Sequence, residues 1–322
     1  MDFGEACHKM NQWGNDEIPF MFILDFELEK PQIYPLAEIP KTIRFSTPRH
    51  PLFPPVPYPG EPFMFEKVPV AYQVYEDAFN LVSRGILHGD SYLLNLTYPT
   101  SIETGFTLEQ IFRHSAAPYR LWVEDRFVVF SPESFIQISD GLIRSFPMKG
   151  TIDASLPDAE QRVLEDPKER AEHFTIVDLI RNDLSRVARE VSVPRFRYVE
   201  AIETYEKRIL QVSSEVTGRL PDQYPAMIGS ILKALLPAGS VSGAPKKKTI
   251  EIIRSAEGIS RGYYTGIFGI FDGKVLESAV MIRYIEQVNG KLWFRSGGGI
   301  THLSDPRHEY QEMIDKVYVS FA

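Results

Sequence analysis

The sequence predicts an α+β protein built on antiparallel sheets, and three observations indicate this class. Residues typical of strands gather in blocks at 17–45, 126–150 and 262–300. Asp-Gly or Asn-Gly pairs, which favour tight hairpin turns, interrupt the second and third blocks. Segments with helical spacing of apolar residues lie between the blocks. Strand blocks with intervening helices favour one large α+β domain built on antiparallel sheets.

Helices are expected in five segments, at residues 72–90, 165–188, 221–237, 244–258 and 304–321. The second and fifth have the clearest start signals. Asp166 and Asp305 are each followed by proline, and aspartate is preferred at a helix cap and proline at the first helical position. Gly89 is a plausible stop for the first.

The N-terminal part has a different composition. Residues 47–63 contain too many prolines for a regular helix or a central strand. We therefore expect residues 1–65 to form short strands and a proline-rich arm packed on a main domain of residues 66–322.

The overall composition excludes several classes of protein. A net charge of -8 argues against a nucleic-acid partner, which usually requires a basic surplus. The single cysteine, Cys7, cannot form an internal disulfide. The N-terminus lacks the order of a signal peptide, and no apolar run approaches the roughly 20 residues that span a bilayer. These features predict a cytoplasmic protein that does not bind membranes.

Acidic side chains repeat at helical spacing in two of the expected helices. Glu169 and Glu172 are three residues apart, as are Glu309 and Glu312, with Lys316 four residues further on. Each set shares one helical face. If the two faces meet, the carboxylates could hold Mg²⁺, which prefers oxygen ligands. The alternative is two solvated charged faces.

Two glycine-rich stretches are candidates for close contact between backbone and ligand. Residues 236–249 enter an expected helix and could offer backbone N–H groups to an anion, although the spacing from glycine to lysine is not that of a Walker A loop. Residues 295–301 are the second stretch. The alternative for both is a tight turn, and Lys246 to Lys248 are interpreted as a solvated helix face.

Three charged residues in apolar surroundings need a partner or a function. Arg283, expected in a strand, could grip a carboxylate bidentately or form an ordinary ion pair. Glu133 follows a strand and could be a general acid if burial raises its pKa, or a surface turn residue. Lys149 could be a structural cation, an anion clamp or a nucleophile.

Eight collinear blocks resemble the chorismate-utilizing enzymes, a family that includes the first components of anthranilate and aminodeoxychorismate synthases and the isochorismate and salicylate synthases. The blocks extend from about residue 70 to the C-terminus. They are GDSYLLNLT, SPESF, FPMKGT, ERAEHFTIVDLIRNDLSRV, AGSVSGAPKKKTIEII, RGYYTGIFG, IRY and SGGGITHLSDPRHEYQEMIDK. The resemblance implies a complex sandwich of two antiparallel sheets packed face to face with helices outside.

The resemblance also assigns roles within a chorismate site that contains Mg²⁺. Glu172 and Glu312 match the metal ligands, and Glu169 and Glu309 match acidic positions that assist the metal. Glu133 matches the general acid. The matched substrate-binding positions are Arg283, Tyr264, Thr151, Ser242, Gly243, Gly297, Gly298, Gly299 and Lys316.

Lys149 favours one branch of the family. The anthranilate and isochorismate branches usually carry alanine at this position, whereas the aminodeoxychorismate branch often carries lysine. Isochorismate and salicylate synthases need a lysine base where this chain has Leu93. The aminodeoxychorismate and anthranilate branches typically have glutamine there, and many relatives have histidine where this chain has Gln211, so Leu93 and Gln211 both depart from the pattern.

The resemblance therefore implies an aminodeoxychorismate synthase component I, an enzyme of transaminase type in p-aminobenzoate and folate biosynthesis. Lys149 would attack C2 of chorismate, Glu133 would protonate the departing C4 hydroxyl, and ammonia would then attack C4. The chemistry requires a neutral lysine, and we expect burial and Mg²⁺ to lower its pKa. Because Cys7 lies outside any nucleophile-elbow context, ammonia would come from a separate glutamine amidotransferase subunit.

Three other functions remain open at this point. The first is anthranilate synthase component I, and the second is an isochorismate or salicylate synthase. The third belongs to a different class, an inert subunit that only docks a glutaminase.

Overall fold

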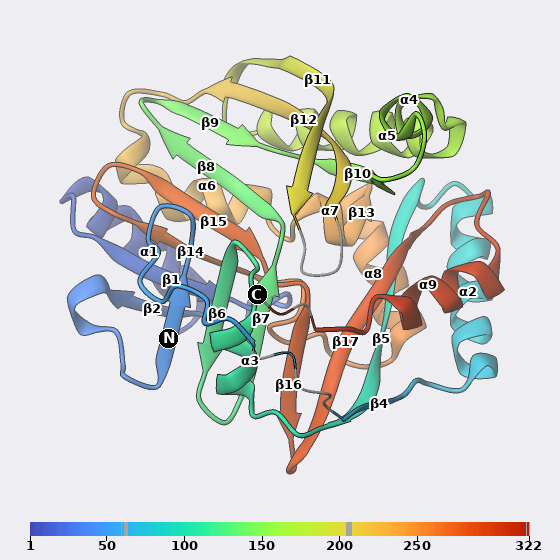
Figure 1. The fold of residues 1–322 in the computed structure, drawn as a ribbon. Coiled ribbons are helices and arrows are strands. Elements are labelled where there is room, and N and C mark those ends of the chain that lie inside the picture. The colour runs from blue at the N-terminus through green and yellow to red at the C-terminus, as the bar shows by residue number, and fades with distance from the viewer. Residues whose placement is uncertain (59, 61–63, 204–207, 320, 322) are drawn as a thin grey trace.

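Two antiparallel β-sheets pack face to face, and the helices lie on their outer sides (Figure 1). The structure, a computed structural model, describes the whole chain except residues 59, 61–63, 204–207, 320 and 322. This architecture confirms the predicted α+β class and the sandwich of two antiparallel sheets.

The first sheet contains nine strands within the described residues. In spatial order they are β10 (Met148–Asp153), β12 (Arg208–Arg219), β9 (Leu142–Ser145), β8 (Ser134–Ser139), β15 (Leu276–Val280), β14 (Ile267–Phe271), β1 (Phe20–Leu24) and β2 (Gln32–Pro35), while β11 (Arg189–Glu203) pairs with β12. β1 is hydrogen-bonded to β14 along its whole length, from Phe20 opposite Phe271 to Leu24 opposite Ile267. The N-terminal strands are thus integral to this sheet.

The second sheet contains eight strands of the described chain. In spatial order they are β13 (Gly243–Ala244), β5 (Leu93–Thr104), β17 (Lys291–Ile300), β16 (Tyr284–Val288), β7 (Phe127–Ser131), β6 (Tyr119–Val123) and β3 (Ile43–Ser46), while β4 (Phe65–Val68) pairs with β5. Strands from residues 1–65 therefore belong to both sheets. The domain boundary at residue 65 stays a prediction.

An apolar core fills the space between the sheets. It joins side chains of β1, β14 and β15 in the first sheet to side chains of β3, β6, β7 and β16 in the second. Fully buried members include Ile23, Phe268, Val129 and Tyr284. β1, β7 and β14 are buried at every position, that is on both faces, so their sequences are continuous apolar runs rather than alternating ones.

The outer faces of the sheets are covered by different helices. On the first sheet, α1 (Phe3–Asn15), α5 (Pro167–Leu184) and α6 (Ile228–Leu235) share a core with β1 and β8. On the second sheet, α2 (Tyr72–Leu87), α8 (Lys246–Glu257) and α9 (Pro306–Asp315) pack on β5 and β17. The remaining helical elements are α3 (Leu108–His114), α4 (Ala159–Glu165), α7 (Gly239–Ser242), η1 (Leu36–Glu38) and η2 (Tyr224–Met227).

The five expected helices are all present, and the two proline-led starts are confirmed. Asp166 accepts from the Glu169 N–H, and Asp305 accepts from the N–H groups of Arg307 and His308. The expectation for 304–321 was too long, because the helix ends at Asp315.

α1 was not predicted from the sequence. Its signal was nevertheless present: Asp2 and Glu5 form a reciprocal capping box, in which each side chain accepts from the other's backbone N–H. The helix buries Ala6 and Met10 against the first sheet.

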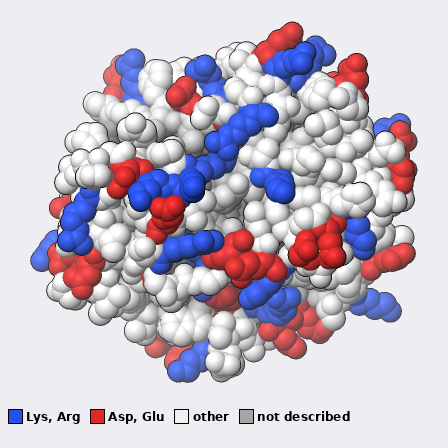
Figure 2. All heavy atoms as spheres, turned by 180° about the vertical axis from the view of Figure 1, so that it is seen from behind, with Lys and Arg blue, Asp and Glu red and all other residues white. Residues whose placement is uncertain are grey.

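Among the residues that the structure describes, one segment, residues 224–242, is long and apolar enough to cross a membrane by length and composition alone. Half of its most apolar window is buried, and Ile228, Ile231 and Leu232 pack in the core of the first sheet. The apolar side chains of α6 are therefore used in packing against the first sheet. On the face shown in Figure 2, Lys and Arg side chains lie among Asp and Glu side chains.

Candidate active site

Lys149 lies on β10 at a break in the strand pairing. The register of β10 against β12 shifts between Met148 and Thr151, and Gly150 between them has a φ of 86°. Only glycine adopts that conformation without strain. At this irregularity in the strand, the Lys149 ammonium lies 3.1 Å from Oε2 of Glu172 on α5.

A second lysine–glutamate pair comes from the C-terminal helix. The Lys316 ammonium is 2.7 Å from Oε1 of Glu312 and donates to the carbonyl of Gly297 at 2.9 Å. Glu309, one turn earlier on α9, is buried. The two helical faces anticipated from spacing therefore both carry ion pairs rather than solvated charges alone.

Two adjacent glycines of β17 lie between the α9 carboxylates and Lys149. A Cβ atom on Gly298 would lie 3.2 Å from Oε2 of Glu309 and 3.7 Å from Oε1 of Glu312. A Cβ atom on Gly299 would lie 3.9 Å from the Lys149 ammonium. Backbone without side chains thus separates the α9 carboxylates from Lys149.

Glu169 completes the acidic region from the side of α5. A Cβ atom on Gly150 would lie 3.4 Å from its Oε2. The site therefore combines four glutamates and two lysines, which come from β10 and from two helices far apart in the sequence, α5 and α9.

Four carboxylates converging on an open glycine backbone have the donor chemistry that Mg²⁺ prefers. As the side chains stand, no three His, Cys, Asp or Glu residues in the described part of the chain are arranged to hold a metal ion. The reason is visible in the ion pairs: Lys149 and Lys316 lie against Glu172 and Glu312. The four glutamates have the oxygen ligands that a hard divalent cation prefers. To bind it, they would have to release the ammonium groups of Lys149 and Lys316.

The expected fall in the Lys149 pKa is wrong for this arrangement. Burial alone would lower the pKa, as anticipated, but the carboxylates of Glu172, Glu312 and Glu169 together outweigh burial and raise it. The lysine is thus a cation here. Desolvation and the metal predicted the opposite direction, because the counter-charge of the glutamates also acts on the lysine.

Glu133 lies in the loop between β7 and β8, opposite the one-turn helix α7. Burial raises the pKa of its carboxyl group, while a hydrogen bond from Ser240 and the positive charge of Lys149 lower it in part. The Ser240 hydroxyl donates to Oε1 at 2.6 Å. A carboxyl group whose pKa is raised and whose one oxygen is held by a donor is suited to act as a general acid through its other oxygen.

Ser240 was not predicted from the sequence, which instead indicated Ser242 and Gly243 in the same glycine-rich stretch. Ser242 is fully buried, and its hydroxyl donates to the Ala238 carbonyl at 2.8 Å. Gly243 has a φ of 129°, and a Cβ atom there would lie 1.9 Å from the Leu93 carbonyl oxygen. These two residues fix α7 against β5. Their contact with substrate stays a prediction.

Arg283 is not in a strand, contrary to expectation. It lies in the loop between β15 and β16 with a φ of 51°. Its guanidinium donates to the Lys316 carbonyl at 2.6 Å and stacks 4.5 Å from the ring centre of Tyr318. The arginine is therefore held at the end of α9.

Tyr264 and Thr151 have contrasting environments. Tyr264 is buried next to Tyr284, and burial raises the pKa of its hydroxyl to about 12, so the group stays protonated. Thr151 is exposed on β10, where it pairs with Gln211 of β12.

Leu93 and Gln211, the two departures from the family pattern, are both buried. Leu93 opens β5, and its Cδ1 would lie 3.1 Å from a Cβ atom on Gly299, the same position that approaches the Lys149 ammonium. An apolar side chain thus faces the lysine from β5.

Lys246 is not on a solvated face as interpreted. It is buried, 2.8 Å from Oδ2 of Asp183 on α5, whereas Lys247 and Lys248 are exposed. Burial lowers the pKa of Lys246.

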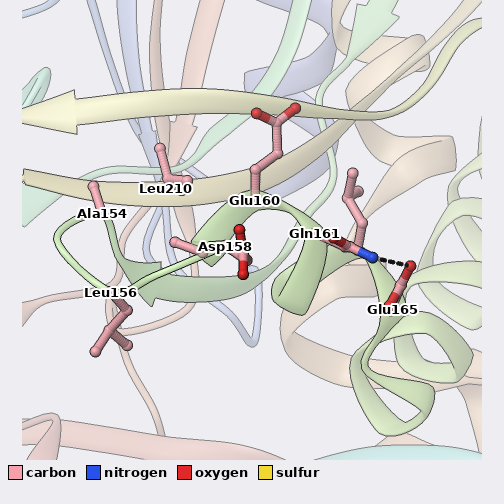
Figure 3. A pocket seen from close by; sticks show the side chains of 9 residues that line it. Ala154, Leu156, Asp158, Glu160, Gln161, Glu165 and Leu210 are labelled. Atoms are coloured by element: carbon pink, nitrogen blue, oxygen red, sulfur yellow. Dashed lines mark hydrogen bonds between the residues drawn. The ribbon is translucent and has the colours of Figure 1, made fainter.

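A surface hollow of about 560 Å³ lies away from these groups, over α4 and β12 (Figure 3). Asp158, Glu160 and Glu165 surround it, and Leu156 and Leu210 contribute apolar surface. None of the candidate catalytic residues lines it.

The chain belongs to the chorismate binding enzyme family, whose sequence model matches residues 41–321. It is 55% identical over 321 residues to an uncharacterized PabA-like protein of Pasteurella multocida, with 99% of each chain covered. It is 34% identical over 257 residues to aminodeoxychorismate synthase component 1 of Bacillus subtilis, covering 76% of this chain and 54% of that enzyme. It is also 34% identical to anthranilate synthase component 1 of Archaeoglobus fulgidus, covering 74% and 59%.

Two solved structures have the same fold. The menaquinone-specific isochorismate synthase MenF of Escherichia coli superimposes with a TM-score of 0.74 at 16% identity, covering 98% of this chain and 81% of that one. Anthranilate synthase component I of Streptococcus pneumoniae superimposes with a TM-score of 0.66 at 29% identity, covering 81% and 61%. The predicted family and fold are thereby confirmed.

Proposed function

We propose that this member of the family is an aminodeoxychorismate synthase component I, which converts chorismate and ammonia into 4-amino-4-deoxychorismate. The observation that supports this reaction is the position of Lys149. Its amine lies among the glutamates at the site, and its charge acts on Glu133. Relatives named for amination at C4 and relatives named anthranilate synthase match this chain equally well, so the lysine, not overall identity, favours C4.

The first half of the reaction uses Lys149 and Glu133. The neutral Lys149 amine forms a bond to C2 of the ring, the ring double bonds shift, and the C4–O bond breaks as Glu133 gives its proton to the departing hydroxyl. Water leaves, and the lysine remains joined to C2. Ser240 binds Oε1 of Glu133, so the proton to be transferred is held on Oε2.

The second half reverses the shift. Ammonia forms a bond to C4, the double bonds return, and the C2–N bond to Lys149 breaks with the electron pair leaving on nitrogen. Glu133 recovers a proton from the incoming ammonia. The net change is replacement of the C4 hydroxyl by an amine with release of one water.

Several of the remaining residues would bind and orient the substrate. Mg²⁺ bound by Glu172 and Glu312, with Glu169 and Glu309 beside them, would neutralise these carboxylates and attract a carboxylate of chorismate. Arg283 and Lys316 provide cations near the end of α9, and Gly298 and Gly299 leave room for the ring. Leu93 places no base at the ring face next to Lys149, which argues against attack by water.

We further propose that ammonia is supplied by a separate glutamine amidotransferase subunit and that the enzyme acts in the cytoplasm, in p-aminobenzoate and folate biosynthesis. The support is indirect. The lone cysteine, Cys7, is buried under α6, where a Cβ atom on Gly229 would lie 2.2 Å from the Cys7 carbonyl oxygen, so it is not placed as a glutaminase nucleophile.

The test is product identification after incubation of the protein with chorismate, ammonium and Mg²⁺, with a matched reaction that lacks ammonium. We expect a product by mass spectrometry in which an amine replaces a hydroxyl, formed only with ammonium. Fluorescent anthranilate would instead assign the first rival. Turnover of chorismate without ammonium would assign an isochorismate or salicylate synthase, and no consumption of chorismate would indicate an inert docking subunit.

A further inference from the structure

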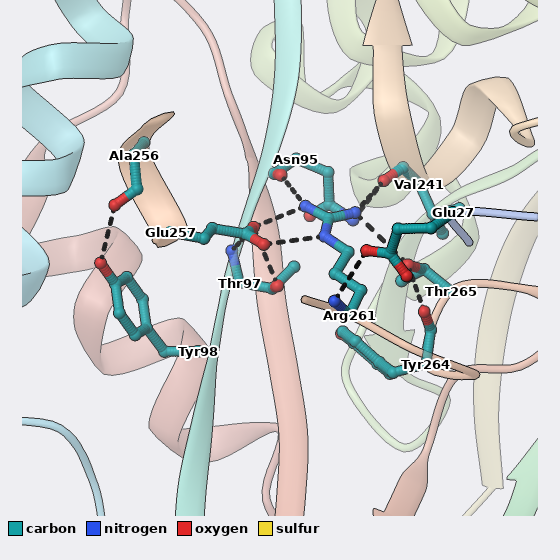
Figure 4. Close-up of polar contacts among 10 residues, drawn as sticks. All are labelled: Glu27, Asn95, Thr97, Tyr98, Val241, Ala256, Glu257, Arg261, Tyr264 and Thr265. Atoms are coloured by element: carbon teal, nitrogen blue, oxygen red, sulfur yellow. Dashed lines mark hydrogen bonds and ion pairs between the residues drawn. The ribbon is translucent and has the colours of Figure 1, made fainter. Parts of the chain in front are cut away.

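Arg261 is a fully buried arginine outside the set of residues considered so far. It lies between α8 and β14, and its side chain is 1% exposed. Figure 4 shows its guanidinium at the centre of polar groups from several elements. Glu257 on α8 neutralises the charge through two bonds, from Nε at 2.9 Å and from Nη2 at 2.6 Å.

The remaining N–H donors of Arg261 bond to backbone carbonyls of two segments that border the site, α7 and β5. Nη1 donates to the Val241 carbonyl of α7 at 2.8 Å, and Nη2 donates to the Asn95 carbonyl of β5 at 2.6 Å. The Asn95 side chain donates to the same Val241 carbonyl at 3.2 Å. The Arg261 guanidinium therefore links α7 to β5, and because the group is planar its N–H donors hold the two segments in a fixed arrangement.

The two segments that Arg261 links, α7 and β5, both carry residues of the candidate site. Val241 follows Ser240, whose hydroxyl holds the Glu133 carboxylate. Asn95 lies opposite Gly299 in the sheet, two residues after Leu93. The Thr265 hydroxyl, 3.4 Å from Nη1, donates to the Tyr264 carbonyl.

Glu257 is held as firmly as its partner. Its Oε1 also accepts from the backbone N–H and the hydroxyl of Thr97, each at 2.9 Å. The backbone N–H of Arg261 donates to Glu27 at 3.0 Å. The pair is thus fixed on both sides, and a buried pair replaced as a whole by neutral groups need not destabilise a protein, whereas removal of one partner does.

We propose that Arg261 is a positioning residue for the proposed general acid: through the Val241 carbonyl it fixes α7, and α7 holds Ser240 on Glu133. This inference rests on the proposed function for its kinetic consequence and on the geometry alone for its structural one. Arg261 itself touches no candidate reacting group, so its effect on chemistry must pass through α7.

The informative variant replaces both charges, Arg261→Met together with Glu257→Gln. No buried charge is left unpaired, and the glutamine keeps an acceptor for Thr97. The bonds to the Val241 and Asn95 carbonyls are lost. Arg44→Met with Glu109→Gln is the control, because it removes another arginine–glutamate pair, between β3 and α3, that lies outside the site.

Hydrogen–deuterium exchange gives the structural readout. We expect amides of α7 and the following residues to exchange faster in the Arg261→Met/Glu257→Gln protein than in the wild type, while the control pair leaves them unchanged. Unchanged exchange of α7 would overturn the proposal. This result does not depend on what reaction the protein catalyses.

A double-mutant cycle with Ser240→Ala gives the kinetic readout. We expect kcat/KM for chorismate with ammonium to fall about 10- to 100-fold in the paired variant, the size expected when a reacting group is misplaced by about an ångström. Adding Ser240→Ala should cause little further loss, because both changes release the same bond to Glu133. Losses that simply multiply would show that Arg261 acts independently of Ser240 and would overturn the proposal.

The pH profile separates positioning from general loss of structure. Lys149 is the charged group that faces Glu133, and Ser240 is its hydrogen-bond donor. Activity that needs protonated Glu133 falls as pH rises through its pKa, and loss of the Ser240 bond raises that pKa. The alkaline limb should therefore move to higher pH in the paired variant and in Ser240→Ala alike. If the wild type consumes no chorismate, the proposed function fails, and the exchange experiment still decides the role of Arg261.

Discussion

The ammonium of Lys149 on β10 lies 3.1 Å from the carboxylate of Glu172 on α5, the helix that packs against this strand. The contact has two consequences. It places the proposed nucleophile next to a proposed metal ligand, and it holds the nucleophile in its unreactive, protonated form. Reactivity of Lys149 therefore depends on what neutralises Glu172.

Replacing Glu172 should make Lys149 easier to deprotonate. Glu172 is the strongest of the charges that raise the Lys149 pKa, so Glu172→Gln should lower it. The measurement is competitive labelling of lysines with an amine-reactive reagent across pH, followed by peptide mass spectrometry. Glu251→Gln, which removes the partner of exposed Lys248, is the control and should leave the Lys149 profile unchanged. A Lys149 profile that does not move in Glu172→Gln would contradict the ion pair.

Ser240→Ala should weaken catalysis and shift its pH dependence. A hydrogen bond to a charged group contributes about 1.5–3 kcal/mol, which corresponds to roughly 10- to 100-fold in rate. Because the bond lowers the Glu133 pKa, its loss raises that pKa further, and the alkaline limb of kcat moves to higher pH. Ser255→Ala, on the exposed side of α8, serves as the control. An alkaline limb that stays in place would remove Ser240 from the role assigned to it.

The neighbouring glycines of β17 should respond differently to alanine. At Gly297 a Cβ atom would lie 2.3 Å from the Leu96 carbonyl oxygen, so Gly297→Ala must displace backbone and should destabilise the fold by about 1–3 kcal/mol or more. At Gly298 the nearest atoms are the ends of the Glu309, Glu312 and Lys316 side chains. Gly298→Ala should fold but bind Mg²⁺ or chorismate more weakly.

Thermal unfolding and titration calorimetry distinguish these outcomes. A Gly298→Ala protein that melts far below the wild type, or a Gly297→Ala protein of wild-type stability, would show that the two positions are assigned wrongly.

His173 should make the fold sensitive to mild acid. It is fully buried, with its Nε2 2.7 Å from the Ser214 hydroxyl, and burial lowers its pKa to about 4 from 6.5. The unfolded chain therefore binds a proton between pH 6.5 and 4 that the folded chain does not, and stability falls as pH falls through this window. Between pH 7 and pH 5 this one group should remove about 2 kcal/mol.

Urea unfolding at the two pH values measures the effect. His173→Gln lacks a titrating ring, so its stability should fall less between pH 7 and pH 5 than that of the wild type. Equal losses in the two proteins would show that His173 is not buried in its neutral form.

Local signals in the sequence explain which elements were predicted. α5 and α9 begin at an aspartate cap followed by proline, and both starts are where the sequence placed them. α1 carries an equally local signal in Asp2 and Glu5 but was overlooked. These features depend on residues three or four positions apart, which is why sequence alone can reveal them.

Features that depend on distant partners were not predictable in the same way. The burial of Lys246 follows from Asp183 on another helix. The sign of the Lys149 pKa shift follows from carboxylates on α5 and α9, more than a hundred residues apart in the chain. Helical spacing shows that such charges share a face, but it does not show which opposite charge that face meets.

The most direct test of the account asks whether Lys149 becomes covalently joined to the substrate. The wild type and Lys149→Ala are incubated with chorismate and Mg²⁺, first without and then with ammonium, and analysed by peptide mass spectrometry and product analysis. We expect an adduct of chorismate less one water on the Lys149 peptide, which disappears on addition of ammonium as the C4 amine forms. We also expect the Lys149→Ala protein to be severely impaired. Near-normal amination by Lys149→Ala would contradict the nucleophilic role and, with it, the choice of branch.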